Sequence, residues 1–295
     1  MQVTVYLLHS FGVETSGGNP AGVVLDAEQL TDKQKIYIAH EIGYSETAFI
    51  EKSDKADFKV SFFTPVEEVP VCGHATIATY SLLFQKKLIK PGSYTHELKP
   101  GVLPIEISDD GMVFMDLAVP VFSDVIPVED LQGIFSVSKE AISSTGLPVQ
   151  IVSTGNPNIF LPIKDRQTLF DLQVDLEKMA VFNRKTKTIG FYVFTLDTLS
   201  KNAIAHARCF WPLYGVNEES VTANAAGSLA CYLFNYKKVK NGQANHLLFE
   251  QGYSLHNPCA VTASLKIQNN TIQRVQVGGK ATIIGEKMIT VPDEL

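Results

Sequence analysis

The stretch GNPAGVV at residues 18–24 organises the chain, because it returns as GNPNIFL at residues 155–161. Each copy is a Gly-Asn-Pro turn that leads into an apolar, strand-like segment. A second pair follows in the same order and at a similar interval, since CGHAT at residues 72–76 opens one apolar helical stretch and TANAAG at residues 222–227 opens another. Two such pairs predict a duplicated domain, with a ligand site in the cleft between the halves. A chance match of short turns is the alternative, and it is the simpler explanation for the Gly-Asn-Pro pair alone.

The bulk properties favour a folded protein that acts on a small molecule. With 295 residues, of which 45% are hydrophobic, the chain can build two domains with buried cores. Its formal charge of −6 comes without a long basic run, which makes nucleic acid and anionic membranes poor partners. The N-terminus MQVTVYLLH alternates like a first strand rather than a signal peptide, and no apolar run approaches the roughly 18 residues of a membrane helix. We therefore expect a soluble, cytoplasmic protein.

Neither the cysteines nor the glycine-rich segments indicate a metal or a cofactor. The four cysteines, Cys72, Cys209, Cys231 and Cys259, are too few and too scattered for a disulfide framework, and no Cys/His cluster has zinc spacing. The stretch GGKA at residues 278–281 lacks the earlier glycine and the Ser/Thr of a phosphate-binding loop. We expect free thiols, no metal and no nucleotide cofactor.

The hydrophobic pattern predicts an α+β protein with one buried helix in each half. TDKQ at residues 31–34 is a capping box that starts a short amphipathic helix, and Gly43 ends it. The stretches 75–84 and 225–236 are apolar almost all round, which is typical of central helices wrapped by other structure. Strand-like segments punctuated by Gly, Pro, Asn and Asp surround them. Each half is thus expected to be a strongly curved sheet around its helix, with the boundary near residues 120–127.

Glu46 is the first candidate acid/base. The pattern of residues 44–50 predicts a strand on which Glu46 shares a face with Ala48 and Ile50. If that face is buried, desolvation raises the pKa of the carboxyl toward neutrality, which suits a general acid/base. If Phe49 marks the inner face instead, Glu46 is a solvated surface carboxylate. The strand alone leaves the two interpretations equal.

His74 follows Gly73 at the start of the first central helix. Free backbone N–H groups there favour an anion such as a substrate carboxylate, and the imidazole can hydrogen-bond it or move a proton. A single histidine at a helix start is more often a capping or packing residue, which is the plainer interpretation. The second helix start, at Ala223 and Asn224, offers a facing set of N–H donors. Two such starts converging on one cleft make a site for an anionic substrate without a metal.

Two further sets of candidates have plainer explanations. Glu218 and Glu219 precede the second helix, where loop carboxylates are usually just solvated. Cys72 can act as a nucleophile or base, but it stands opposite Thr222 in the repeat, which argues against a matched two-thiol mechanism. A buried, inert thiol is the simpler prediction for Cys72.

In combination, these motifs resemble the phenazine-biosynthesis PhzF-like family, which has the diaminopimelate epimerase-like fold. The resemblance is most specific in the first half and continues in the same order over nearly the whole chain. The matching stretches are GNPAGVV (18–24), SETAF (45–49), FTP (63–65), EV (68–69), CGHAT (72–76), RCFWP (208–212), TANAAGSL (222–229), QG (251–252) and VGG (277–279).

The resemblance implies two similar, barrel-like halves with the active site between them. We place the halves at residues 1–120 and 121–295, with the last strand able to return to the first half. The family's chemistry implies a cofactor-independent isomerase, frequently a homodimer, whose glutamate moves a proton between carbons of a cyclic dihydro-hydroxyanthranilate while a histidine helps to hold the substrate. The site residues expected here are Glu46, His74 and Glu219 as catalytic groups, with Gly73, Ala75, Thr222, Ala223 and Asn224 as substrate-binding groups.

The second helix start departs from the family pattern. Where the family has Glu-Asp-Pro-x-Thr-Gly-Ser-Ala, this chain has EESVTANA at residues 218–225, so Glu219 replaces an aspartate and Asn224 a serine. Asn257 stands where arginine is usual. Because these changes fall on the half expected to shape selectivity, we expect a small carboxylate substrate other than the phenazine intermediate. An amino-acid racemase or epimerase with paired bases, and a binding protein without turnover, are the alternatives.

Overall fold

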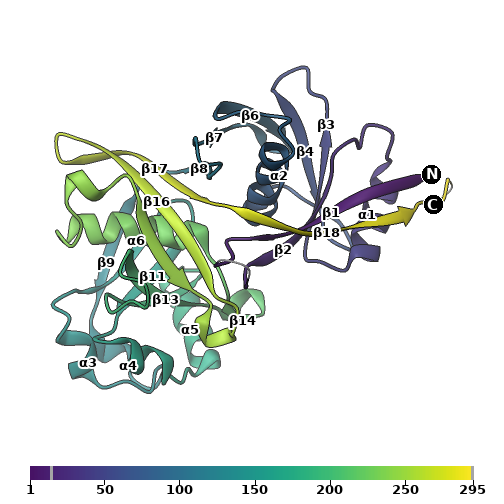
Figure 1. Cartoon of the computed structure of the whole chain (residues 1–295). Coiled ribbons are helices and arrows are strands. Elements are labelled where there is room, and N and C mark those ends of the chain that lie inside the picture. The colour runs from purple at the N-terminus through teal and green to yellow at the C-terminus, as the bar shows by residue number, and fades with distance from the viewer. Residues whose placement is uncertain (14–15, 294–295) are drawn as a thin grey trace. The chain divides into compact units, whose positions relative to one another are not determined.

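The computed structural model describes residues 1–13 and 16–293, which form two compact units. The first unit is Met1–Met115 together with the C-terminal segment that begins at Gly278, and the second is Asp116–Val277. The last strand, β18 (Ala281–Thr290), lies antiparallel to the first strand, β1 (Gln2–Ser10), as Figure 1 shows. The two ends of the chain therefore build the same unit.

The described residues of the first unit form a sheet with two helices. Its antiparallel pairs include β18–β1, β1–β2, β3–β4, β4–β5, β6–β7 and β7–β8, and the pairs β2–β3 and β4–β6 are parallel. Its other elements are β2 (Asn19–Val24), α1 (Asp32–Ile42), β3 (Thr47–Glu51), β4 (Phe58–Phe63), β5 (Glu68–Val69), α2 (Gly73–Gln85), β6 (Gly92–Leu98), β7 (Gly101–Ile107) and β8 (Val113–Leu117), which runs across residue 115.

The second unit has more helices, most of them short. Its strands are β9 (Val121–Ile126), β10 (Val149–Ser153), β11 (Pro157–Pro162), β12 (Gly190–Thr195), β13 (Ala203–Trp211), β14 (Val216–Glu219), β15 (Leu247–Gln251), β16 (Cys259–Gln268) and β17 (Thr271–Gly279). Its helices are α3 (Lys139–Ser143), α4 (Arg166–Phe170), α5 (Leu176–Thr186) and α6 (Ala223–Asn235), with short 3₁₀ turns at Val128–Leu131, Pro212–Tyr214, Asn241–Gln243 and Tyr253–Leu255.

The strand pairing of the second unit repeats that of the first. The antiparallel pairs β10–β11 and β12–β13 match β1–β2 and β3–β4, and the parallel pairs β11–β12 and β13–β15 match β2–β3 and β4–β6. The Gly-Asn-Pro turns lead into β2 and β11, while the CGHAT and TANAAG motifs start α2 and α6. The fold class predicted from the sequence, with two similar halves, is thus confirmed.

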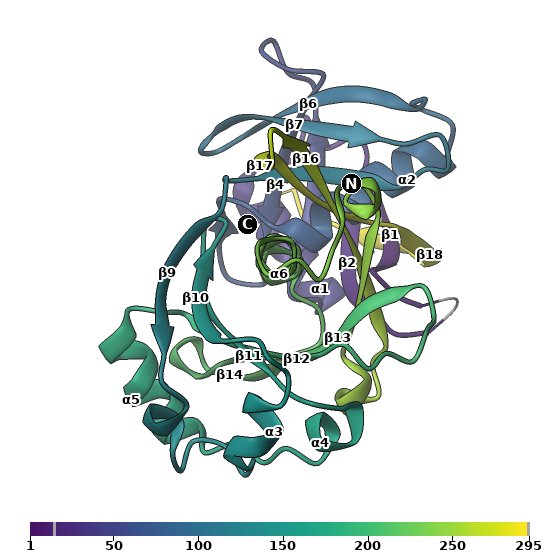
Figure 2. The same ribbon diagram turned by 90° about the vertical axis from the view of Figure 1, so that its left-hand side faces the viewer.

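The helices α2 and α6 are the buried helices of their units. Every residue of the stretches 75–83 and 225–233 is buried, which explains why these helices are apolar all round. The hydroxyls of Thr76 and Thr79 bond to carbonyls one turn back in α2, so their burial leaves no donor unpaired. Figure 2 looks nearly along α6 and shows strands of the second unit curving around it. In the described part of the chain, no helix has the length and apolarity needed to cross a membrane.

The ends of α1 follow the prediction, whereas the start of β3 does not. Thr31 and Gln34 form the reciprocal capping box, and Gly43 ends α1 in the left-handed conformation with φ 72°. The predicted strand over residues 44–50 is wrong at its start, because β3 begins at Thr47. Both faces of β3 are buried, from Thr47 to Ile50, so alternation along the strand does not decide the environment of Glu46.

Candidate active site

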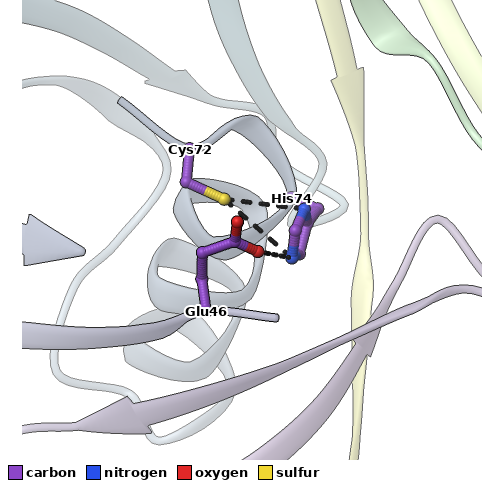
Figure 3. Close-up of side chains that lie close together, drawn as sticks. All are labelled: Glu46, Cys72 and His74. Carbon is purple, nitrogen blue, oxygen red and sulfur yellow. Dashed lines mark hydrogen bonds and ion pairs between the residues drawn. The ribbon is translucent and has the colours of Figure 1, made fainter. Parts of the chain in front are cut away.

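Glu46 and His74 lie side by side in the first unit. Glu46 directly precedes β3, and His74 is the second residue of α2. Glu46 Oε2 is 3.2 Å from His74 Nε2, an ion pair that Figure 3 marks with a dashed line, and the two side chains are 20% and 15% exposed. Both groups are therefore largely shielded from water but still accessible to a small molecule.

The repeated glycine motif holds the segment that carries Glu46. The Gly22 N–H of β2 donates a 3.2 Å hydrogen bond to the Glu46 carbonyl. A Cβ atom at Gly22 would lie 2.7 Å from the Thr47 hydroxyl oxygen and 3.2 Å from a Val5 methyl. Only glycine at position 22 lets β2 pack this close to β1 and β3, because the neighbouring side chains, Val5 and Thr47, are buried and β-branched.

The start of α2 presents backbone donors next to this pair. Cys72 is the N-cap residue and makes no side-chain capping bond, so no cap competes for the N–H groups of the first turn. Ser10, the last residue of β1, holds the first turn of α2 in place, because its hydroxyl donates a 2.7 Å hydrogen bond to the His74 carbonyl. Ala75 is completely buried, so only its backbone can reach a ligand.

Cys72 is buried, as predicted, but it is not an isolated thiol. Its Sγ atom lies 3.5 Å from His74 Nδ1 and 3.9 Å from Nε2. The thiol therefore lies at the start of α2 within contact distance of the imidazole, next to the Glu46 carboxylate. The sequence favoured an inert thiol because residues 72 and 74 are too close along the chain for periodicity to indicate whether their side chains meet.

The pKa of Glu46 differs from the raised value that burial of the carboxyl alone would give. Burial raises the pKa of its carboxyl, but polar contacts with His74 and Ser45 lower it by more than burial raises it. The pKa of Glu46 therefore lies below its ordinary value. For His74, burial lowers the pKa, but Cys72 and Glu46 raise it, and the net pKa lies above the ordinary value. The pair therefore rests as a carboxylate and an imidazolium, and Glu46 begins as a base rather than as an acid.

Glu46 also has an oxygen that the protein leaves without a hydrogen bond. Its Oε2 atom is buried and has no hydrogen-bond partner among the described residues, although His74 Nε2 is at ion-pair distance. The imidazolium balances part of the charge on this oxygen, and a polar hydrogen or an acidic C–H of a bound molecule can supply the hydrogen bond that it lacks.

The fold also creates a ligand set that the sequence did not indicate. Cys and His residues with zinc spacing are absent from the sequence, yet Glu46, Cys72 and His74 place one candidate ligand atom each within 4.8 Å of the others. Glu46 lies 26 positions before Cys72, so only the packing of β3 against α2 brings the three together.

The remaining predicted residues lie in the second unit, around the start of α6. Thr222 is the N-cap residue and Ala223 the first residue of α6, while Glu219 ends β14. The Asn224 side chain donates to the Thr154 carbonyl at 3.3 Å, and its Oδ1 atom is buried with no hydrogen-bond partner among the described residues. The meeting of these residues with Glu46 and His74 in one cleft stays a prediction.

Gln251 is a positioning residue that the sequence did not single out as part of the site. Its amide donates to the Glu219 carbonyl at 2.7 Å and to the Thr222 hydroxyl at 3.2 Å, and its oxygen accepts from the Thr222 N–H. These bonds hold the turn between β14 and α6. The available signal was the pair of polar residues, Glu250 and Gln251, that ends the strand LLFEQ after three apolar residues. Glu218 also differs from the prediction of a solvated carboxylate, because Arg208 binds both of its oxygens.

The fold and the comparisons with known proteins identify the family. Two repeated units, each built around a buried helix, define the diaminopimelate epimerase-like class of fold. Residues 8–287 match the PhzC-PhzF family of phenazine biosynthesis-like proteins, and the chain belongs to this family. The resemblance found in the sequence is thus confirmed.

Curated and structural relatives match almost end to end. The chain is 31% identical to an uncharacterized isomerase of Clostridium acetobutylicum, and the match covers 95% of both chains. It is 30% identical to the uncharacterized isomerase YddE of Escherichia coli K12, over 96% of this chain and 97% of the relative. The crystal structure of a PhzF-family phenazine biosynthesis protein from Bacillus anthracis superposes with a TM-score of 0.83 at 27% identity, covering 99% of this chain and 100% of that one.

Proposed function

We propose that this chain is an isomerase that moves a proton between two carbons of a small carboxylate, with Glu46 as the base. The observation that carries the proposal is the buried Oε2 atom of Glu46, which lies 3.2 Å from His74 Nε2 and makes no hydrogen bond within the described residues. The names of the relatives in C. acetobutylicum and E. coli, both isomerases, support the same class.

The chemistry follows from the resting charges of the pair. The Glu46 carboxylate takes a proton from an acidic carbon, and the electron pair left behind moves into the adjoining π system. The protonated carboxyl then returns the proton to another carbon of the same molecule, so that no atom or electron is gained or lost. The His74 imidazolium stabilises the negative charge that develops on the substrate.

The start of α2 supports a substrate that carries a carboxylate. The N–H groups of Gly73 and its successors point out of an uncapped helix N-terminus, where the helix dipole favours an anion. The His74 imidazolium adds a positive charge at the same place. This part of the proposal predicts that neutral amides of active carboxylates are poor substrates.

The test measures exchange of carbon-bound hydrogen in deuterated water. A panel of small unsaturated and cyclic carboxylates is incubated with the wild-type chain, and mass spectrometry detects deuterium on carbon and any isomer formed. We expect Glu46→Gln, which keeps the shape and loses the base, to lower the rate by roughly 10² or more. Glu41→Gln, an exposed glutamate on α1, is the matched control. Equal exchange by wild type and Glu46→Gln would exclude Glu46 as the base, and exchange of no compound would favour the binding-protein alternative.

Epimerisation is the second candidate, and the position of Cys72 favours it. An epimerase needs bases on both faces of one carbon, and the Cys72 thiol and the Glu46 carboxylate both contact His74. Chiral chromatography of amino acids from the same incubations separates the two reactions. Deuterium at the α-carbon with inversion, abolished by Cys72→Ala, would establish epimerisation, whereas isomerisation moves the double bond and does not require the thiol.

A further inference from the structure

We propose that Glu46, Cys72 and His74 form a binding site for a zinc ion, which inhibits the enzyme when it is bound. The three side chains offer a carboxylate oxygen, a thiolate sulfur and an imidazole nitrogen from the segments that begin β3 and α2 in the first unit (Figure 3). Three protein ligands are the number found in zinc sites that keep one position open.

The distances between the ligand atoms suit a tetrahedral ion. Zinc bonds of about 2.0–2.3 Å imply nitrogen and oxygen ligands about 3.3 Å apart and sulfur and nitrogen ligands about 3.6 Å apart. Here His74 Nε2 lies 3.2 Å from Glu46 Oε2 and 3.9 Å from Cys72 Sγ. A small rotation of the Cys72 side chain closes the remaining few tenths of an ångström.

The surroundings of the cluster favour a bound cation. Glu46 Oε2 is buried and has no hydrogen-bond partner in the described part of the chain, so an ion would satisfy it. The side chains of Glu46 and His74 are partly exposed, which leaves a path for the ion to enter. No Lys or Arg side chain is paired with Glu46 in any ion pair of the described residues. The positive charge beside Glu46 is the His74 imidazolium, which loses its proton when it becomes a ligand.

The mixed ligand set also predicts which metals bind. A thiolate with an imidazole selects Zn²⁺ and its spectroscopic substitute Co²⁺, whereas Mg²⁺ and Ca²⁺ prefer sites made of oxygen ligands. Binding releases one proton from the Cys72 thiol and one from the His74 imidazolium, since only the thiolate and the neutral imidazole are ligands, so affinity should rise with pH.

Inhibition rests on the proposed function, but metal binding does not. If Glu46 is the base, an oxygen bonded to zinc cannot take a proton from carbon, so zinc should lower turnover and a chelator should restore it. The binding itself can be measured by absorbance, without any substrate. A failure of the metal site is therefore distinguishable from a failure of the isomerase proposal.

The first experiment titrates the chelator-treated, full-length protein with Co²⁺. We expect one Co²⁺ per chain, with a sulfur-to-cobalt charge-transfer band that Zn²⁺ abolishes and Mg²⁺ does not. Cys72→Ala should lose the band, and Cys231→Ala, which removes a buried thiol of α6, should keep it. Absence of the band in the wild type, or its persistence in Cys72→Ala, would overturn the proposal.

A second variant decides the matter if Cys72→Ala fails to fold. Glu46→Gln removes a charged ligand at a partly exposed position, and competition with a chromophoric chelator measures its affinity for Zn²⁺. Loss of a ligand should weaken binding on the order of tenfold or more. The control Glu41→Gln should bind Zn²⁺ as the wild type does. Equal affinity of Glu46→Gln and the wild type would contradict the assignment.

Discussion

At the scale of single residues, three side chains share one electrostatic system. Glu46, Cys72 and His74 contact one another, and these contacts lower the pKa of Glu46 and raise the pKa of His74. This coupling makes Glu46 a base at rest, since the carboxylate beside an imidazolium is more stable than the neutral pair. Substituting any one of the three should therefore alter the chemistry of the other two, and their effects should not add.

Gly73 tests whether a substrate approaches the backbone of α2. A Cβ atom at Gly73 would meet only a Met115 methyl, at an ordinary contact distance of 3.6 Å, so Gly73→Ala should fold normally. If a substrate carboxylate binds the N–H groups here, the added methyl should raise KM severalfold, with little change in thermal stability. The matched control is Gly285→Ala on β18, where a Cβ atom has no neighbour within 4 Å. Unchanged kinetics in Gly73→Ala would place the carboxylate elsewhere.

At the scale of elements, buried polar pairs tie strands to loops. In the second unit, Glu250 on β15 contacts His206 on β13 at 2.9 Å and accepts hydrogen bonds from the Leu199 and Ser200 N–H groups. Both side chains are almost completely buried. Glu250 thus joins two parallel strands and the loop that precedes β13.

This pair predicts a pH-dependent stability. Burial raises the pKa of Glu250, but the bonds from His206 and from two backbone N–H groups lower it by more than burial raises it. The pKa of Glu250 in the folded protein therefore lies below the ordinary value. A depressed carboxyl pKa contributes stability above the unfolded pKa, and this contribution is lost as pH falls through the folded pKa. Glu250→Gln should therefore cost about 1.5–3 kcal/mol at pH 7 and progressively less in acid.

Denaturant unfolding at several pH values measures this effect. The chain has one tryptophan, Trp211, which lies in the second unit and reports its unfolding by fluorescence. Glu177→Gln, an exposed glutamate on α5, should change stability by less than about 0.5 kcal/mol at every pH. A cost for Glu250→Gln that stays constant from pH 7 into acid would disprove the linkage.

At the scale of the whole molecule, the chain returns to its beginning. Strand β18 pairs along the whole of β1, from Gln2 opposite Thr290 to Ser10 opposite Ala281. Ile289 and Val291 join the core that packs α1 against the sheet of the first unit. The first unit is therefore not complete until residues 281–291 have been made.

Because β18 pairs with β1, a substitution on β18 should destabilise the elements at the N-terminal end of the chain. Ile289→Ala should destabilise the first unit by about 2–5 kcal/mol, since Ile289 is 5% exposed in its core. Hydrogen exchange with mass spectrometry should show faster exchange in β1, β2 and α1, with no change in β12 and β13. Ile284→Ala on the same strand, where the side chain is 50% exposed, should have little effect. Faster exchange confined to the second unit would contradict this account.

The sequence alone determined the features that depend on near neighbours in the chain. The capping box at Thr31, the stop at Gly43 and the buried character of α2 and α6 follow from spacings of a few residues, and the structure confirms them. The duplication was also visible, because the same local motifs begin corresponding elements of each unit.

Only the tertiary structure decided how the functional groups act on one another. The start of β3, the direction of the Glu46 pKa shift and the contact of Cys72 with His74 all depend on β2, β3 and α2 packing together. Gln251 holds the start of α6 from 29 positions away. Such contacts have no local signature, because the free energy that brings distant residues together comes from burial of the whole sheet and helix rather than from the sequence around any one of them.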